Sequence, residues 1–263
     1  MNLAPFLVSS AVIDSDHHSV RQLAGSVCCE NQLGTIRATY ELVRDRFAHS
    51  YDIGAAEVSV SASDVIRHGH GICFAKAHLL AALLRANDIA AGFCYQKLER
   101  EDQGPPETCL HGLNAVWFDG RWCRLDPRGN KPNTAGPFDP DCERLAYSID
   151  AGRGERDYRD VFAEPLPCVP AVLQGSCTVG ELDRNCPRPR LKQAASGASN
   201  IIEGKLFHAG RFATRLTGLK CPLAIVIAGR AEGPYVTTAG STEFRCLAIL
   251  LDTLPPRLET LAV

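Results

Sequence analysis

Residues 69–77 read Gly-His-Gly-Ile-Cys-Phe-Ala-Lys-Ala, and this stretch decides the fold. Its glycines and histidine interrupt the chain, whereas a helical pattern runs without a break from Cys73 to Asn87. Cys73 therefore lies in the first turn of a predicted helix, where free backbone N–H groups and the helix dipole favour negative charge. Because the thiolate and not the thiol is the nucleophile, Cys73 is a candidate nucleophile.

The predicted helix that follows is apolar almost all round. Its two apolar stripes consist of Ala77, Leu80 and Leu84, and of Leu79 and Leu83. A helix of this kind is buried, so it can hold Cys73 rigidly. A structural core cysteine remains the alternative, and the rest of the chain must separate the two.

Length and composition indicate an ordinary globular protein. The 263 residues are 45% hydrophobic and 22% charged, which is typical of a globular protein. The length suits one large domain or one domain with an appendage. A formal net charge of −2 gives no electrostatic basis for binding nucleic acid or an anionic membrane surface. No apolar run approaches the length of a membrane span. We expect neither kind of partner.

Twelve cysteines are many for such a chain, but they are scattered. Only Cys28 and Cys29 are adjacent, and no Cys-x-x-Cys pair suggests a zinc or thioredoxin-like site. The N-terminal apolar run lacks the preceding basic region of an export signal. We therefore expect a cytoplasmic protein with reduced thiols. His17 and His18, beside aspartates, are expected to be solvated rather than to bind a metal.

Periodicity and turn signals divide most of the chain into elements. Helices are predicted at 32–48, 65–68 (capped by residues 61–64), 167–173 and 179–182, with a helix start at 20–24. Strands are predicted at 89–95, 111–118 and 121–125, and a short strand is predicted within 6–13. Residues 98–109 and 131–141 are expected to be surface loops, and 145–158 has no clear pattern.

The character of the sequence changes near Arg188. The run Pro187-Arg188-Pro189-Arg190 breaks the pattern, and a polar stretch and short apolar runs follow it without a catalytic motif. We predict a domain over residues 1–187 and a C-terminal extension over residues 188–263.

A base and a group that orients it are the partners that a cysteine nucleophile needs. His111 stands at the start of one predicted strand and Asp126 at the end of the next, and the Asp119-Gly120 turn joins the two strands. Antiparallel neighbours bring such positions together, so Asp126 can hold one imidazole nitrogen while the other faces Cys73.

Five segments, in this order, resemble the transglutaminase-like superfamily, which shares the papain-like cysteine fold. They are Tyr40–Asp45, Gly69–Lys76, Leu110–Val116, Arg124–Asn130 and Glu164–Pro167. The resemblance is to the short bacterial members and covers roughly residues 10–187, with three ordered motifs. Asp88 and Ala90 depart from it, since the family often has glycine and proline there.

The resemblance implies an α+β fold in which a nucleophile helix packs on an antiparallel sheet. It also implies acyl transfer through a thioester on a peptide or other amide-containing substrate, with Cys73, His111 and Asp126 as the catalytic residues and no cofactor. The Cys73 backbone N–H is the expected oxyanion donor, and the sequence names no second one. Water as acceptor would make the protein a peptidase or amidase, and an amine would make it a transglutaminase.

Two other classes of protein stay open at this point. One is a catalytically silent binding module that keeps the fold. The other is a zinc protein that uses Cys73, Cys109, His111 and Cys123, although these four lack close paired spacing.

Overall fold

The computed structural model describes residues 1–100, 108–129, 131–186, 190–191 and 202–203. The chain divides into two units, Met1–Phe207 and His208–Val263, and every described residue belongs to the first. Nearly all of the predicted extension lies outside the described residues, so the domain boundary after residue 187 stays a prediction. Among the described residues, no helix combines the length and the apolar character that crossing a bilayer requires.

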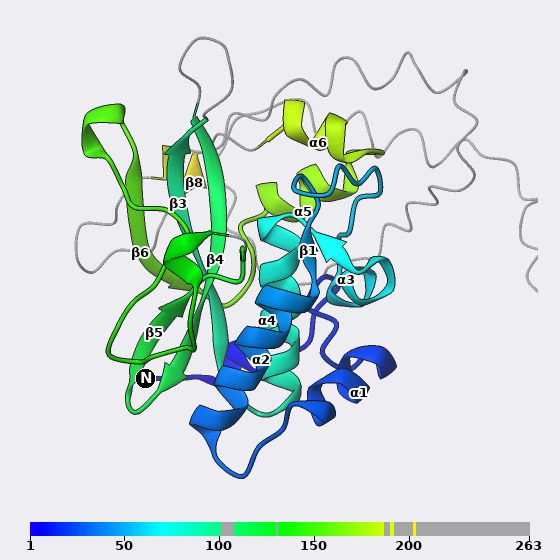
Figure 1. Ribbon diagram of the computed structural model, residues 1–263, viewed down its shortest axis with the longest axis vertical. Coiled ribbons are helices and arrows are strands. Elements are labelled where there is room, and N and C mark those ends of the chain that lie inside the picture. The colour runs from blue at the N-terminus through cyan, green and yellow to red at the C-terminus, as the bar shows by residue number, and fades with distance from the viewer. Residues whose placement is uncertain (101–107, 130, 187–189, 192–201, 204–263) are drawn as a thin grey trace, which may run out of the picture. The chain divides into compact units, whose positions relative to one another are not determined.

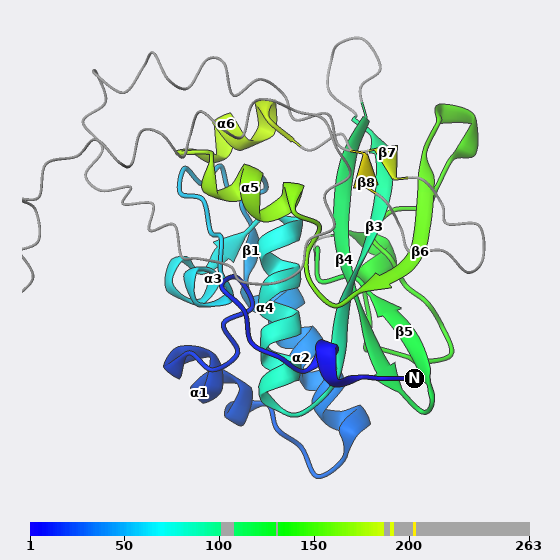
Figure 2. The ribbon, with the colours of Figure 1, turned by 180° about the vertical axis from the view of Figure 1, so that it is seen from behind.

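Helices form one layer of the first unit and lie along one face of its main sheet (Figures 1 and 2). The α-helices are α1 (His18–Ser26), α2 (Gln32–Arg46), α3 (Ala62–His68), α4 (Cys73–Ala86), α5 (Cys168–Gln174) and α6 (Val179–Arg184). Short 3-10 turns occur at Ala4–Phe6, Pro132–Thr134 and Ala151–Arg153.

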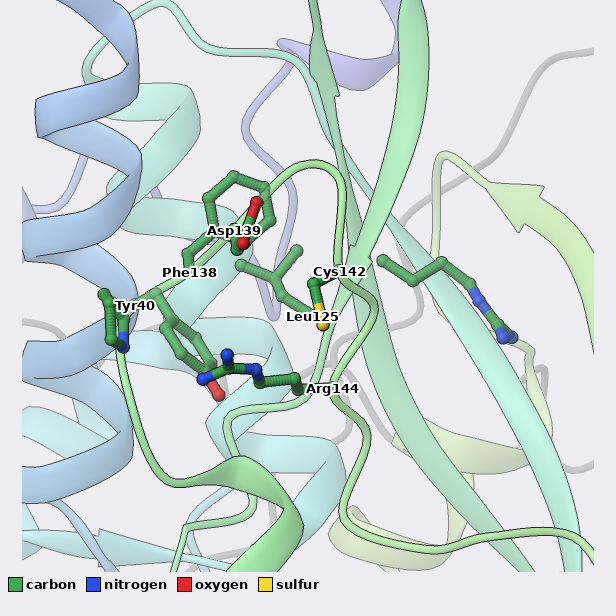
Figure 3. Close-up of a pocket in the computed structure, with 8 residues that line it drawn as sticks. Tyr40, Leu125, Phe138, Asp139, Cys142 and Arg144 are labelled. Atoms are coloured by element: carbon green, nitrogen blue, oxygen red, sulfur yellow. The ribbon is translucent and has the colours of Figure 1, made fainter.

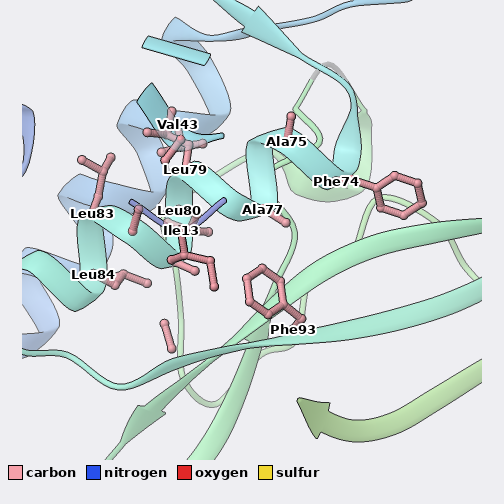
Figure 4. Packing of buried hydrophobic residues seen from close by; sticks show 14 of the residues in the cluster. Ile13, Val43, Phe74, Ala75, Ala77, Leu79, Leu80, Leu83, Leu84 and Phe93 are labelled. Atoms are coloured by element: carbon pink, nitrogen blue, oxygen red, sulfur yellow. The ribbon is translucent and has the colours of Figure 1, made fainter. Parts of the chain in front are cut away.

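Helix α4 is the centre of the core. Every residue from Phe74 to Arg85 is buried, which explains why the sequence is apolar on all sides. Four of its leucines are 0% exposed: Leu79, Leu80, Leu83 and Leu84. Figure 4 shows them packed among side chains of other elements, including Ile13, Val43 and Phe93. Since each buried leucine contributes about 1.5–3 kcal/mol, this packing fixes the helix that begins at Cys73.

The main sheet is antiparallel, with the strand order β5-β4-β3-β6. Its strands are β3 (Ala91–Glu99), β4 (Thr108–Phe118), β5 (Arg121–Leu125) and β6 (Arg156–Phe162). Helix α4 packs on β3 and β4. The predicted α+β fold, with a nucleophile helix on an antiparallel sheet, is therefore confirmed.

A second, two-stranded sheet leads into α4. Strand β1 (Ala48–His49) pairs in parallel with β2 (His70–Gly71), and His49 lies opposite Gly71. A Cβ atom at Gly71 would lie 3.0 Å from Cβ of Ala75, so a larger residue here would require its neighbours to move slightly. Strands β7 (Arg190–Leu191) and β8 (Ile202–Glu203) form a third pair.

Most predicted elements are confirmed, including α2, the α5–α6 pair and the hairpin of β4 and β5. Ser61 and Asp64 form a reciprocal capping box at the start of α3, as the polar run at 61–64 suggested. The predicted strand within 6–13 is wrong, because Ala4–Phe6 is a 3-10 turn and no strand follows it there.

The predicted loop 98–109 is shorter than expected. Strand β3 continues to Glu99 and β4 begins at Thr108, while residues 101–107 lie outside the described residues. Strand β6 falls partly in a stretch to which the sequence assigned no structure. It is an edge strand in which only Tyr158 is buried, so it carries no alternating apolar signal.

Candidate functional site

Cys73 is the first residue of α4 and is partly exposed. The apolar side chain of the residue before it, Ile72, cannot accept a hydrogen bond and so does not cap the helix. Instead, the Cys73 backbone N–H donates a hydrogen bond to Nε2 of His49, with a distance of 3.1 Å between the two nitrogens. The prediction that Cys73 opens a buried helix is confirmed, and its N–H already has an acceptor.

His111 lies on β4, three residues inside the strand rather than at its start. The next residue, Gly112, faces the nucleophile helix, since a Cβ atom there would lie 2.6 Å from a ring carbon of Phe74. This close approach brings β4 against the first turn of α4. The last paired residues of β4 and β5 are Asn114 and Leu125, and Asp126 follows directly.

The carboxylate of Asp126 contacts the imidazole of His111. His111 Nε2 and Asp126 Oδ2 are 2.8 Å apart, and both side chains are buried. Oδ2 also accepts a hydrogen bond from the Ala146 backbone N–H, and Oδ1 accepts one from the Arg128 backbone N–H; both N–O distances are 3.0 Å. Three hydrogen bonds therefore hold the carboxylate in one orientation.

This contact is an ion pair. Burial alone would lower the pKa of His111, but the Asp126 carboxylate and a hydrogen bond with Cys73 outweigh burial and raise it to about 10. Burial alone would raise the pKa of Asp126, yet His111 and the backbone N–H groups of Ala146 and Arg128 lower it. The imidazole is therefore protonated at neutral pH and faces an ionised carboxylate.

The Cys73 side chain lies close enough to His111 to contribute to the raised pKa of the imidazole. Because Nε2 of His111 is bound to Asp126, Nδ1 is the nitrogen left for the sulfur. The ring of Tyr147 meets the imidazole edge to face, with the centroids 4.9 Å apart, and fixes its plane. The structure thus brings together the three residues that the sequence singled out.

Two nearby groups escaped the sequence analysis. His49 reaches Cys73 through the pairing of β1 with β2, and nothing in the local sequence signals this contact. Arg128 makes a two-pronged ion pair with Asp52, with both N–O distances 2.7 Å, and so ties the loop after β5 to the segment after β1. Charged residues of this kind look like ordinary surface positions until the fold is known.

The described residues contain no group of three or more His, Cys, Asp or Glu side chains that could hold a metal ion. The zinc alternative on Cys73, Cys109, His111 and Cys123 therefore gains no support. A small pocket lies between α2 and β5 (Figure 3) and is lined by Tyr40, Arg124, Leu125, Pro137, Phe138, Asp139, Cys142 and Arg144. None of the three candidate catalytic residues lines it.

Residues 21–127 match the family model of the transglutaminase-like superfamily. The match includes Cys73, His111 and Asp126. No curated protein matches the chain.

Three solved structures resemble parts of the chain at low identity. A candidate cysteine protease from Cytophaga hutchinsonii is 23% identical, with a TM-score of 0.41, over 60% of this chain and 52% of its own. A candidate protease from Parabacteroides distasonis is 13% identical (TM-score 0.33, 51% of this chain and 25% of its own). A TGase is also 13% identical (TM-score 0.30, 43% and 30%). The chain thus matches about half the length of the first of these proteins.

Proposed function

Residues 21–127 belong to the transglutaminase-like superfamily, and from this premise we propose that the protein catalyses cysteine-dependent acyl transfer on amide substrates through a thioester. The observation that carries the proposal is the chain of contacts from the Cys73 thiol through the His111 imidazole to the buried Asp126 carboxylate. A thiol, a protonated imidazole and a fixed carboxylate in this order have the roles of a cysteine triad.

In the first half-reaction the Cys73 thiolate attacks the carbonyl carbon of the amide. His111 gives the proton at Nδ1 to the leaving nitrogen as the C–N bond breaks, and the acyl group stays on sulfur as a thioester. Asp126 stabilises the imidazolium before that transfer and keeps Nδ1 directed at the sulfur.

In the second half-reaction His111, now neutral, takes a proton from the acceptor as the acceptor attacks the thioester. The C–S bond breaks and the Cys73 thiolate is regenerated. Water as acceptor releases a carboxylic acid, and a primary amine gives a new amide. Access of water to the thioester decides between peptidase and transglutaminase chemistry, and the triad serves both.

The proposed substrate is a peptide or another molecule with an accessible amide, and the proposed compartment is the cytoplasm. No cysteine in the described part of the chain forms a disulfide, which suits a reducing compartment.

Acylation by an activated ester tests the proposal. The full chain is mixed with 4-nitrophenyl acetate, and peptide mass spectrometry locates the acetyl group. We expect one acetyl group on Cys73, no such adduct in Cys73→Ala, and slow acylation in His111→Ala. Cys28→Ala, which removes an exposed cysteine, is the matched control and should react like the parent. If the parent protein is not acetylated at Cys73, a binding module without catalytic activity is favoured instead.

Addition of a primary amine to the acetylated protein then identifies the acceptor. Free acetate alone means hydrolysis, and an acetylated amine means transfer.

A further inference from the structure

A second histidine lies against Cys73, and the proposed triad does not use it. The pairing of β1 with β2 places His49 opposite Gly71, and its Nε2 lies 3.1 Å from the Cys73 backbone nitrogen. The ring is 6% exposed, and the Tyr51 ring packs against it with a centroid distance of 5.4 Å. His49 therefore touches the atom from which an oxyanion donor is expected.

The proton of this imidazole has a defined place in the resting protein. Burial, followed by the nearby Arg128 guanidinium, lowers the pKa of His49 well below its ordinary value, so the ring is neutral at pH 7. Because Nε2 accepts the Cys73 N–H, the one ring proton resides on Nδ1. Yet Nδ1 is buried and has no hydrogen-bond partner among the described residues.

This arrangement is unlike that of a histidine with only a structural role. A ring that merely capped α4 would be expected to have its second nitrogen fixed by an acceptor, since that bond selects the tautomer. In His49 only the bond to Cys73 favours the Nδ1–H form. Moving the proton to Nε2 breaks no hydrogen bond at Nδ1.

With the proton on Nε2, two donors face each other: the His49 Nε2–H and the Cys73 N–H. Two N–H groups in contact repel one another, and an oxygen that gains negative charge between them removes the repulsion. Such a site binds the transition state better than the free substrate, which is the condition for catalysis.

We propose that His49 supplies the second donor of the oxyanion hole, next to the Cys73 backbone N–H. The inference rests on the acyl-transfer function proposed above. The proton balance is neutral, because the ring releases the Nδ1 proton to water and takes one from water at Nε2. The acyl donor then binds the Nε2–H form, and the Cys73 N–H turns from His49 to the substrate oxygen.

Two reactions of Cys73 separate this role from simple support of the helix. Acetylation by 4-nitrophenyl acetate passes through an oxyanion, whereas alkylation by iodoacetamide is a direct displacement without one. We expect His49→Phe to lower the acetylation rate by about 10²–10³-fold, with alkylation within a few-fold of the parent. His49→Gln places an N–H donor near the position of Nε2 and should recover most of the acetylation rate.

The outcomes are distinguishable. If the parent is not acetylated at Cys73, the proposed function itself fails. If the parent reacts and His49→Phe is acetylated at the parental rate, or loses both reactions equally, only the assignment of His49 is overturned.

A measurement on the parent protein covers the case in which His49→Phe does not fold. An aldehyde such as N-acetylglycinal adds to the thiolate and places an oxyanion in the site. Nitrogen NMR of the ¹⁵N-labelled imidazole should show the His49 proton on Nδ1 in the free protein and on Nε2 in the adduct. A proton that stays on Nδ1 in the adduct would contradict the proposal.

Discussion

At the scale of single residues, the carboxylate of Asp126 controls the imidazolium of His111. The pKa of His111 is raised to about 10, so this ring keeps its proton through neutral pH and loses it as the pH rises through that value. In Asp126→Asn the charge that holds the proton is gone. We expect the pH at which the His111 imidazolium loses its proton, followed by NMR of the ring, to fall by about one to two units.

Catalysis should suffer less than this shift suggests. An amide in place of Asp126 can still orient the ring, and the helix start also favours the thiolate, so acylation should be reduced and not abolished. The control is Asp119→Asn, in the turn between β4 and β5, which should leave the titration of His111 unchanged. If the titration of His111 is unshifted in Asp126→Asn but shifted in Asp119→Asn, Asp126 is not the carboxylate that stabilises the imidazolium.

The reactivity of the cysteines gives a second prediction at this scale. Cys73 should be alkylated at pH 7 faster than the more exposed cysteines, because the positive end of α4 and the His111 imidazolium both lie beside its sulfur. The exposed ones are Cys28, Cys29, Cys142 and Cys177. Peptide mapping after brief treatment with limiting iodoacetamide measures the order. His111→Ala should bring Cys73 down to the level of the others, and preferential labelling of these four in the parent would refute the prediction.

At the scale of elements, the buried side chain of Lys76 ties two other segments to α4. Its ammonium donates to the backbone carbonyls of Phe47 (2.6 Å), Arg44 (3.2 Å) and Arg128 (3.3 Å). Burial lowers the pKa of Lys76 to about 8, so the group still carries its charge at pH 7. The end of α2 and the loop after Asp126 are thereby tied to the nucleophile helix.

Lys76→Met leaves these carbonyls without their donor. We expect the free energy of unfolding to fall by about 2–4 kcal/mol, since buried acceptors without a partner are costly. Denaturant unfolding at pH 7 measures the loss, and Lys97→Met on β3 is the matched control, with a change near zero. An equal loss of unfolding free energy in both variants would show that the hydrogen bonds from Lys76 to the carbonyls do not stabilise the fold.

The turn after α4 contains a strained residue. Asp88 has φ 57°, in the left-handed region that favours glycine, and it stands where the family often has glycine. Asp88→Gly should raise the free energy of unfolding by about 0.5–1 kcal/mol because it relieves this strain. Asn185→Gly at the end of α6, where φ is −100°, is the matched control and should give no gain. A loss of stability in Asp88→Gly would mean that its side chain contributes more than the strain costs.

Sequence periodicity predicted the elements whose stability is local. The helices α2, α3 and α4 show apolar spacing or a cap, and the Asp119-Gly120 turn aligned the strands that carry His111 and Asp126. Strand β6 and His49 escaped because tertiary pairing alone defines them. Strand β6 needs only the edge of β3, and His49 approaches Cys73 only when β1 meets β2.

At the scale of the whole molecule, the question is where the catalytic unit ends. In the described part of the chain, the contacts of the triad come from residues 49–147, and the core includes residues as late as Leu182. The sequence placed the boundary after residue 187, whereas the first unit of the structure extends to Phe207 and includes the β7–β8 pair. Two shortened chains decide between these boundaries.

A chain ending at Phe207 should unfold at a temperature close to that of the parent and alkylate Cys73 at the parental rate, because it keeps all the described residues that pack in the core or hold the triad. A chain ending at Pro187 lacks β7 and β8. If it behaves like the longer form, the boundary read from the sequence holds. If it aggregates or melts earlier while the longer form does not, residues between 188 and 207 cover apolar surface of the domain. Aggregation of both forms would mean that residues after Phe207 are themselves part of the folded unit.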